Sequence, residues 1–249
     1  MTIIASSSGV SADQRSMPAT RRAVCVSVSE GYERWASTYD RTPNPLLALE
    51  QRSVAPLLPS LEGKRALDIA CGTGRWCEIL AACGAGRTVG TDFSAAMLSK
   101  AAQKPAARGA LVQANACRLP FAKLYFDFAI CSFAASHIAR LDLLASECAR
   151  VLKPDADLFL TDVHPEAHAT GWRTGFRDRD VALEITTMPR SRAEIVHDFS
   201  QAGFQCEGLA QFTFGLPEKA IFLRAGKTAD FLERASRVPA VLLCRFRRR

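Results

Sequence analysis

The chain has 249 residues, 48% of them apolar, and a formal net charge of +7. This length and apolar share are sufficient for one sizeable α/β core with additions. No apolar run approaches the about 18 residues that a membrane helix needs, and residues 1–20 lack the basic and apolar regions of a secretory signal. We therefore exclude a membrane-spanning protein.

The nine cysteines do not form a Cys-x-x-Cys pair. In a chain of this size they predict reduced thiols rather than a disulfide framework, so we expect a cytoplasmic protein. Part of the positive charge lies in the C-terminal residues Arg245, Arg247, Arg248 and Arg249. Such an end could contact nucleic acid or an acidic carrier, but a solvated basic end is the interpretation we favour.

Residues 1–28 are rich in serine and small polar residues, which predicts a flexible N-terminal tail. Residues 29–60 are predicted to form a helical cover. Tyr32, Trp35, Ala36 and Tyr39 recur at intervals of three and four, which places them on one face of a helix. On its own this stripe predicts packing against the core.

Residues 65–70 form an apolar run that predicts a buried strand, and the glycines Gly72 and Gly74 follow it. Glycine accepts positive φ and lets a ligand lie against bare backbone. A helix predicted over residues 75–82 would add free N–H groups behind the turn. Asp68 near the end of the strand disfavours a pyrophosphate and favours a cationic ligand.

A second strand, predicted over residues 88–92, ends in Asp92, where an acid is expected to hold ribose hydroxyls. Further strands are predicted at residues 110–114, 126–132 and 158–163, with helices between them. This alternation predicts a parallel sheet with right-handed crossovers. Ligands bind at the carboxyl ends of such strands. Four segments should meet there, through Gly72, Asp92, Asn115 and Ser132.

The motif Asp-x-Ala-Cys-Gly-Thr-Gly over residues 68–74, followed by Asp92, resembles class I S-adenosylmethionine-dependent methyltransferases. Residues 32–40 and 115–121 resemble the ubiquinone/menaquinone-biosynthesis type of this family. The family's usual glycine is Ala70 here, and its usual acid beside the adenine is Asn115. The resemblance implies a Rossmann-like, doubly wound α/β fold. Its seven-stranded sheet is mostly parallel with an antiparallel last strand, and it has an N-terminal helical cover.

The resemblance further implies that residues 61–163 form the cofactor-binding core and that S-adenosylmethionine is the cofactor. The residues it assigns to cofactor binding are Asp68, Ala70, Cys71, Gly72, Thr73, Gly74, Asp92, Phe93, Met97, Asn115, Ala116, Cys117, Ser132 and Tyr39. The family's chemistry implies methyl transfer to an oxygen or carbon of a small, hydrophobic metabolite. Tyr32 would also face the cofactor on this resemblance.

Residues 164–190 lack periodicity, which predicts an active-site loop or lid, with Trp172 nearest the acceptor and His164 on the same side. Residues 191–249 are predicted to complete the same domain. The capping box of Ser191 and Glu194 should begin a helix. A buried final strand is expected over residues 241–244.

His137 follows the fourth predicted strand closely enough to face the cavity, and imidazole suits a general base. The alternative is that His137 has a structural role in packing or capping. His164 and His168 lie four residues apart, but Pro165 stands where a zinc motif has its glutamate, so no metal site is predicted. Cys71, Cys77 and Cys83 recur every six residues and are interpreted as small buried apolar residues.

Two other functions remain open from the sequence. A methyltransferase acting on exocyclic amines of nucleic-acid bases would carry an acidic-or-Asn-Pro-Pro-aromatic turn, whereas residues 131–134 read Cys-Ser-Phe-Ala. The sequence therefore favours a small-molecule acceptor over RNA. A non-catalytic S-adenosylmethionine-binding protein would keep the same glycines and acids. The sequence predicts neither the acceptor nor the oligomeric state.

Overall fold

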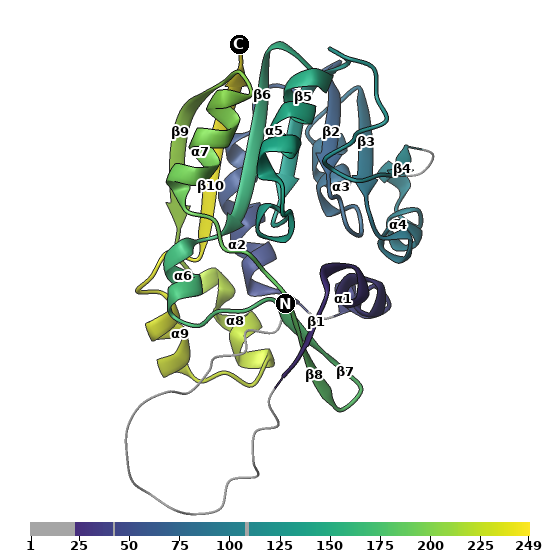
Figure 1. Ribbon diagram of the computed structural model, residues 1–249. Coiled ribbons are helices and arrows are strands. Elements are labelled where there is room, and N and C mark those ends of the chain that lie inside the picture. The colour runs from purple at the N-terminus through teal and green to yellow at the C-terminus, as the bar shows by residue number, and fades with distance from the viewer. Residues whose placement is uncertain (1–22, 42, 108–109) are drawn as a thin grey trace, which may run out of the picture.

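The computed structural model describes residues 23–41, 43–107 and 110–249. Its centre is a seven-stranded sheet with the strand order β4-β3-β2-β5-β6-β10-β9 (Figure 1). The strands are β2 (Arg65–Ile69), β3 (Arg87–Asp92), β4 (Leu111–Gln113), β5 (Phe126–Ser132), β6 (Leu152–Val163), β9 (Phe204–Phe212) and β10 (Val241–Arg248).

The strand directions confirm the predicted topology. Strand β2 is parallel to β3 and β5, and the pairs β3–β4 and β5–β6 are also parallel. The last strand, β10, lies between β6 and β9 and is antiparallel to both. Val241, Leu242, Leu243 and Cys244 are buried, as predicted.

Both faces of the sheet are covered, which explains why its strands are nearly continuous apolar runs. Leu67 and Ile69 of β2 point into one cluster of buried residues, and Ala66 points into another. Helices α5 (Leu141–Val151) and α7 (Arg192–Gln201) contribute to the first cluster. Helices α2 (Pro45–Val54) and α3 (Arg75–Ala82) contribute to the second. In Figure 1, α5 and α7 lie in front of the sheet and α2 behind it.

Local signals begin the helices where the sequence predicts. The hydroxyl of Ser94 accepts from the backbone N–H of Met97 and caps α4 (Ala95–Ala101). Ser191 and Glu194 form the predicted capping box of α7. Within the described ranges, short 3-10 helices connect other elements, at Tyr39–Arg41, Ala55–Leu57, Pro105–Ala107 and Ala135–His137.

A second, three-stranded sheet was not predicted. It consists of β1 (Val24–Val26), β8 (Val181–Ile185) and β7 (Gly175–Asp178), with β1 parallel to β8. Helix α1 (Val28–Trp35) packs on it, and Trp35 stacks on Phe176 with ring centroids 4.8 Å apart. These elements, residues 24–35 and 175–185, are called the cover below.

The cover corrects two predictions. Residues 1–22 of the predicted tail lie outside the described residues, but residues 24–26 form a strand and α1 begins at Val28. The predicted loop over residues 164–190 contains α6 (Pro165–Ala169) and the β7–β8 hairpin. This segment lacks helical periodicity because much of it forms a β-hairpin. Strand β8 of the hairpin pairs with β1, which is distant in the sequence. Such pairing leaves no local sequence signal.

Helices α8 (Leu216–Arg224) and α9 (Ala229–Ala235) lie between β9 and β10 in the chain. They share an apolar cluster with the end of β6 and with α6, below the sheet in Figure 1. Across the described ranges, none of the helices has the length and hydropathy of one that crosses a membrane.

Candidate active site

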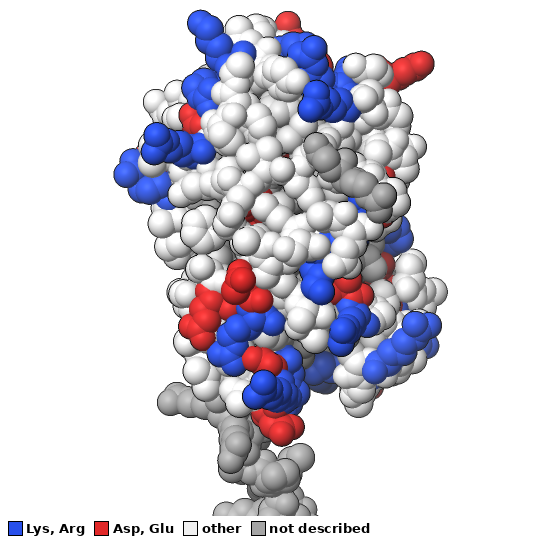
Figure 2. Space-filling view, turned by 90° about the vertical axis from the view of Figure 1, so that its right-hand side faces the viewer, with Lys and Arg blue, Asp and Glu red and all other residues white. Residues whose placement is uncertain are grey.

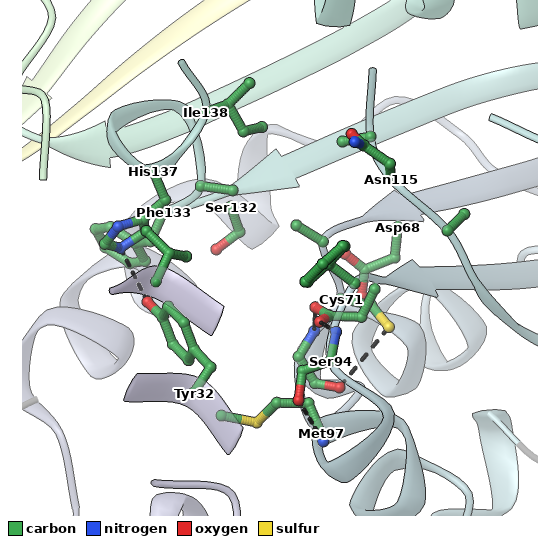
Figure 3. A pocket seen from close by; sticks show the side chains of 18 of the residues that line it. Tyr32, Asp68, Cys71, Ser94, Met97, Asn115, Ser132, Phe133, His137 and Ile138 are labelled. Carbon is green, nitrogen blue, oxygen red and sulfur yellow. Dashed lines mark hydrogen bonds between the residues drawn. The ribbon is translucent and has the colours of Figure 1, made fainter. Parts of the chain in front are cut away.

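A cavity of about 610 Å³ lies at the carboxyl ends of β2, β3 and β5, where the cover meets the sheet. It is lined by His137 and by every predicted cofactor-binding residue except Gly74. Figure 3 shows Asp68, Cys71, Ser94 and Asn115 on one side of this space, and Tyr32, Phe133 and His137 on the other. The convergence predicted from the strand ends is therefore present.

The two glycines of the turn after β2 have different roles. Both have left-handed backbone, with φ of 56° at Gly72 and 79° at Gly74. A Cβ on Gly72 would meet nothing within 4 Å, and Gly72 lines the cavity. A Cβ on Gly74 would lie 3.1 Å from Cβ of Ala101 in α4. A side chain at position 74 would therefore crowd α4, whereas Gly72 lies at the cavity.

Asp92 connects the glycine turn to helix α4. Its Oδ2 accepts the backbone N–H of Gly72 at 2.7 Å, and its Oδ1 accepts that of Ser94 at 2.8 Å. Burial raises the pKa of this carboxyl. Each carboxylate oxygen keeps further lone pairs, so Asp92 can also accept hydroxyls from the cavity. Asp92 therefore stabilises the turn and has the capacity to bind a ligand in the cavity.

Asp68 is buried at the end of β2, with its Oδ1 lacking any hydrogen-bond partner. Its Oδ2 accepts from the thiol of Cys77 at 3.5 Å. Burial raises the pKa of Asp68 to about 7. A buried carboxylate without a cationic partner is costly, and Asp68 lines the cavity. Its free oxygen suits the ammonium group of a ligand.

Asn115 follows β4 and lines the cavity on the same side as Asp68 and Asp92. Its Oδ1 accepts the backbone N–H of Cys117 at 2.9 Å, which closes a local turn after β4. The side-chain NH₂ of Asn115 remains available to the edge of a base. Phe93 is 59% exposed while Met97 is buried, and both line the cavity.

A buried ionic network was missed by the sequence analysis. Glu50 of α2 is fully buried and forms an ion pair with Arg75 at the start of α3. The same carboxylate accepts from the hydroxyls of Ser132 and Thr161 and from the indole N–H of Trp76. The signal was a carboxylate on the apolar face of a helix, beside the buried Leu46 and Leu49.

Arg75 lines the cavity, and its Nη1 is buried without a partner. The pairing with Glu50 fixes the guanidinium, so the free N–H groups are oriented before a ligand arrives. Arginine binds carboxylates in this way. Arg75 is therefore a further candidate for ligand binding, next to the glycine turn.

Tyr32 and His137 form the other side of the cavity. The Tyr32 hydroxyl lies 2.9 Å from Nε2 of His137, and Nδ1 of His137 is buried without a partner. Burial raises the pKa of Tyr32 well above its ordinary value and lowers that of His137 to about 4. Both groups are therefore neutral near pH 7. Tyr39 also lines the cavity, and burial raises its pKa to about 12.

The predicted acceptor-binding residues lie elsewhere. His164 is buried and caps α6, with Nδ1 accepting the backbone N–H of Glu166 at 3.2 Å. Trp172 is buried against Phe214, with ring centroids 5.3 Å apart. Neither residue lines the cavity, so the structure lends no support to their predicted contact with the acceptor. The chain turns away after β6 into the cluster shared with α8 and α9.

The residues present fit the cofactor implied by the sequence resemblance. Asp68 offers an unpaired carboxylate oxygen to an ammonium, and Arg75 offers unpaired N–H groups to a carboxylate. Asp92 can accept ribose hydroxyls, and a Cβ on Gly72 would point into open space. The donors and acceptors thus match the methionine and ribose parts of S-adenosylmethionine.

Comparisons with known proteins agree with this geometry. Residues 67–160 match the family model described as a methyltransferase domain. A demethylmenaquinone methyltransferase of Geobacillus kaustophilus is 34% identical over 134 residues, covering 49% of this chain and 57% of the relative, so the chain spans just over half of that protein. The Bacillus cereus protein of the same name is 26% identical over 219 residues, 76% of this chain and 92% of the relative.

The fold also has close counterparts among solved structures. An S-adenosylmethionine-dependent methyltransferase from Mesorhizobium loti superimposes with a TM-score of 0.62. It is 23% identical, and the match covers 82% of this chain and 100% of that one. At this identity the likeness concerns the fold.

Proposed function

Since the chain belongs to the class I S-adenosylmethionine-dependent methyltransferases, we propose that it methylates an oxygen or carbon of a small, hydrophobic metabolite. The relatives named demethylmenaquinone methyltransferases point to an acceptor of this class.

The observation that carries the proposal is the division of the cavity lining. Its acidic residues, Asp68 and Asp92, both lie on the cofactor side. The remaining wall is mainly apolar and also contains the neutral Tyr32 and His137. Its polar members are Ser27, Ser29 and Arg140, and its apolar members include Val28, Leu47, Phe133, Ala134, Ile138 and Leu143. Such a wall favours an apolar acceptor with few polar groups.

The paired charges on the cover favour a small acceptor over a nucleic acid at that part of the surface. Figure 2 shows lysine and arginine side chains mixed with acidic ones over the lower part of one face. One mixed cluster belongs to the cover, where Arg34 pairs with Glu30 and Asp178. Paired charges of this kind neutralise each other, whereas a nucleic-acid site needs a basic surface.

For the cofactor, the protein supplies complementary charge and a fixed position. We propose that Asp68 binds its ammonium, Arg75 its carboxylate, Asp92 its ribose hydroxyls and Asn115 its adenine edge. Bound S-adenosylmethionine supplies an electrophilic methyl group on a sulfonium. The cover excludes water from the acceptor side, and alignment of the two reactants lowers the barrier.

For the acceptor, we propose that Tyr32 and His137 remove the proton. The Tyr32 oxygen accepts the acceptor's O–H, and its own proton moves to Nε2 of His137 along the 2.9 Å hydrogen bond. His137 has a pKa of about 4, which is sufficient because an oxygen that gains a methyl group becomes strongly acidic. The imidazole would then carry the positive charge of the accepted proton.

The test is cofactor binding followed by turnover. Calorimetric titration with S-adenosylhomocysteine should give one site per chain. Radiolabelled methyl transfer should then appear with hydroxylated aromatic and quinol acceptors. Binding without transfer to any acceptor in a broad panel would favour a non-catalytic protein. Transfer to RNA instead would contradict the small-molecule acceptor.

A further inference from the structure

Three potential metal ligands converge beneath the cofactor side of the cavity. They are Asp68 at the end of β2, Cys71 in the glycine turn and Cys77 in α3, and one ligand atom of each lies within 4.8 Å of the other two. Across the described parts of the chain, this is the one group of three or more such residues. All three are buried.

Gly90 of β3 provides the space for the two sulfur atoms. A Cβ at this position would lie 2.8 Å from Sγ of Cys77 and 2.9 Å from Sγ of Cys71. Both thiols therefore point to the same spot above β3. The regular spacing of six residues concealed this, because Cys71 precedes the helix, whereas Cys77 lies inside it and Cys83 is exposed.

One distance within the group matches the edge of a tetrahedral site. Zinc binds oxygen at about 2.0 Å and sulfur at about 2.3 Å, so an oxygen–sulfur edge of its tetrahedron measures about 3.5 Å. Oδ2 of Asp68 and Sγ of Cys77 are 3.5 Å apart. Oδ1 of Asp68 is buried and has no partner. Two thiols and a carboxylate form a donor set for a thiophilic divalent cation.

We propose that Asp68, Cys71 and Cys77 bind a thiophilic divalent cation of the Zn²⁺ class, and that this cation and the cofactor exclude each other. Asp68 and Cys71 also line the cavity, so the fourth coordination position opens toward the cofactor side. A bound cation would occupy the carboxylate assigned above to the ammonium, and it would repel that ammonium and the sulfonium. The exclusion rests on the proposed function; the binding of metal does not.

Metal binding is tested first, with tag-free, reduced protein and ZnCl₂ in competition with a chromophoric chelator. Cys77→Ser keeps a hydroxyl donor for Asp68 but removes one sulfur ligand. Cys83→Ser is the matched control, because Cys83 is an exposed cysteine at the C-terminal end of the same helix. We expect one Zn²⁺ per chain in the wild type and in Cys83→Ser, and its loss in Cys77→Ser. Equal Zn²⁺ affinity in all three proteins would overturn the site.

A second measurement on the wild-type protein tests the site even if Cys77→Ser fails to fold. Zinc-edge X-ray absorption should show two sulfur ligands at about 2.3 Å. A coordination shell of nitrogen and oxygen alone would overturn the assignment.

Exclusion is tested by titrating S-adenosylhomocysteine in the presence of Zn²⁺. At ten times the Kd for Zn²⁺, competition raises the apparent Kd of the cofactor product about elevenfold. EDTA should reverse the effect, and Cys77→Ser should not show it. Binding of both ligands without mutual effect would overturn the exclusion while leaving the proposed methyl transfer intact. Recovery with dithiothreitol but not with EDTA would indicate a Cys71–Cys77 disulfide and overturn the metal.

Discussion

The hydroxyl of Tyr32 and Nε2 of His137 form a 2.9 Å hydrogen bond between positions 105 residues apart in the chain. Because burial raises the pKa of Tyr32, the tyrosine stays protonated, and its O–H can donate a hydrogen bond to Nε2. The neutral imidazole then carries its own proton on Nδ1. The bond therefore ties α1 of the cover to the segment after β5 and selects one tautomer of His137.

Tyr32→Phe should lower the free energy of unfolding by about 0.5–1.5 kcal/mol, because it removes one buried hydrogen bond. It should also reduce turnover, since the proton loses its path to His137. Urea denaturation and single-turnover rates measure the two effects. Tyr125→Phe is the control, because Tyr125 lies against Arg65, away from the cavity lining. Normal turnover in Tyr32→Phe would show that Tyr32 does not pass the proton to His137.

His137→Gln should lower kcat by about 10²- to 10⁴-fold, the range of a positioned general base. Glutamine can still accept from Tyr32, so the cover should remain in place and cofactor affinity should hold. A folded variant with ordinary turnover would show that His137 is not the general base. Catalysis would then depend on alignment of the acceptor with the cofactor.

The pH dependence of kcat follows from the same residue. His137 must be neutral to accept a proton, and burial lowers its pKa from 6.5 to about 4. The neutral form therefore persists at lower pH than for an ordinary histidine. We expect kcat to be constant between pH 6 and 8 and to fall only as the pH approaches about 4. A midpoint near 6.5 would indicate that water reaches the imidazole.

Cofactor affinity should rise with pH through the titration of Asp68. The folded pKa of about 7 lies above the ordinary value of 3.8, so protonation is favoured in the free protein. The contribution of Asp68 to folding stability is therefore lost as the pH rises from 3.8 to about 7. An ammonium ligand requires the ionised form. S-adenosylhomocysteine should thus bind more tightly at pH 8 than at pH 6 in calorimetry. Asp68→Asn should bind weakly at both values, with a flat pH profile.

The two glycines of the turn should respond differently to alanine. Both substitutions place a side chain in left-handed backbone, at a cost of about 1–2 kcal/mol. Gly74→Ala adds a close contact with Ala101, so it should be the less stable variant. Gly72→Ala directs its methyl group into the cavity, so it should lose more cofactor affinity. Equal losses of affinity in two folded variants would contradict this division.

Asp92→Ala should weaken cofactor binding at least about tenfold, since charge-assisted hydrogen bonds contribute about 1.5–3 kcal/mol each. It should also lower the melting temperature, because the N–H groups of Gly72 and Ser94 lose their acceptor. Asp127→Ala is the matched control: Asp127 accepts the backbone N–H of Arg65 at the far end of the sheet. Unchanged cofactor affinity in Asp92→Ala would remove its assignment to the ribose.

The sequence by itself determined the sheet and the cofactor side of the cavity. Strands buried on both faces, such as β2 and β5, are nearly continuous apolar runs, and neighbouring parallel strands place their carboxyl ends together. The positions of Gly72, Asp92 and Asn115 were therefore predictable from strand ends alone. Caps such as Ser94 and Ser191 are equally local, because their partners lie within three residues.

Only the tertiary structure decided the rest. The pairing of β1 with β8 joins residues about 160 positions apart and turns a predicted tail and a predicted loop into one cover. Trp172 and His164 were predicted at the cavity, but the direction of the chain after β6 buries them against other elements. Glu50, Arg75, Cys71 and Cys77 acquired their roles through neighbours from other elements. Contacts of this kind depend on packing in space, which the periodicity of a single segment does not encode.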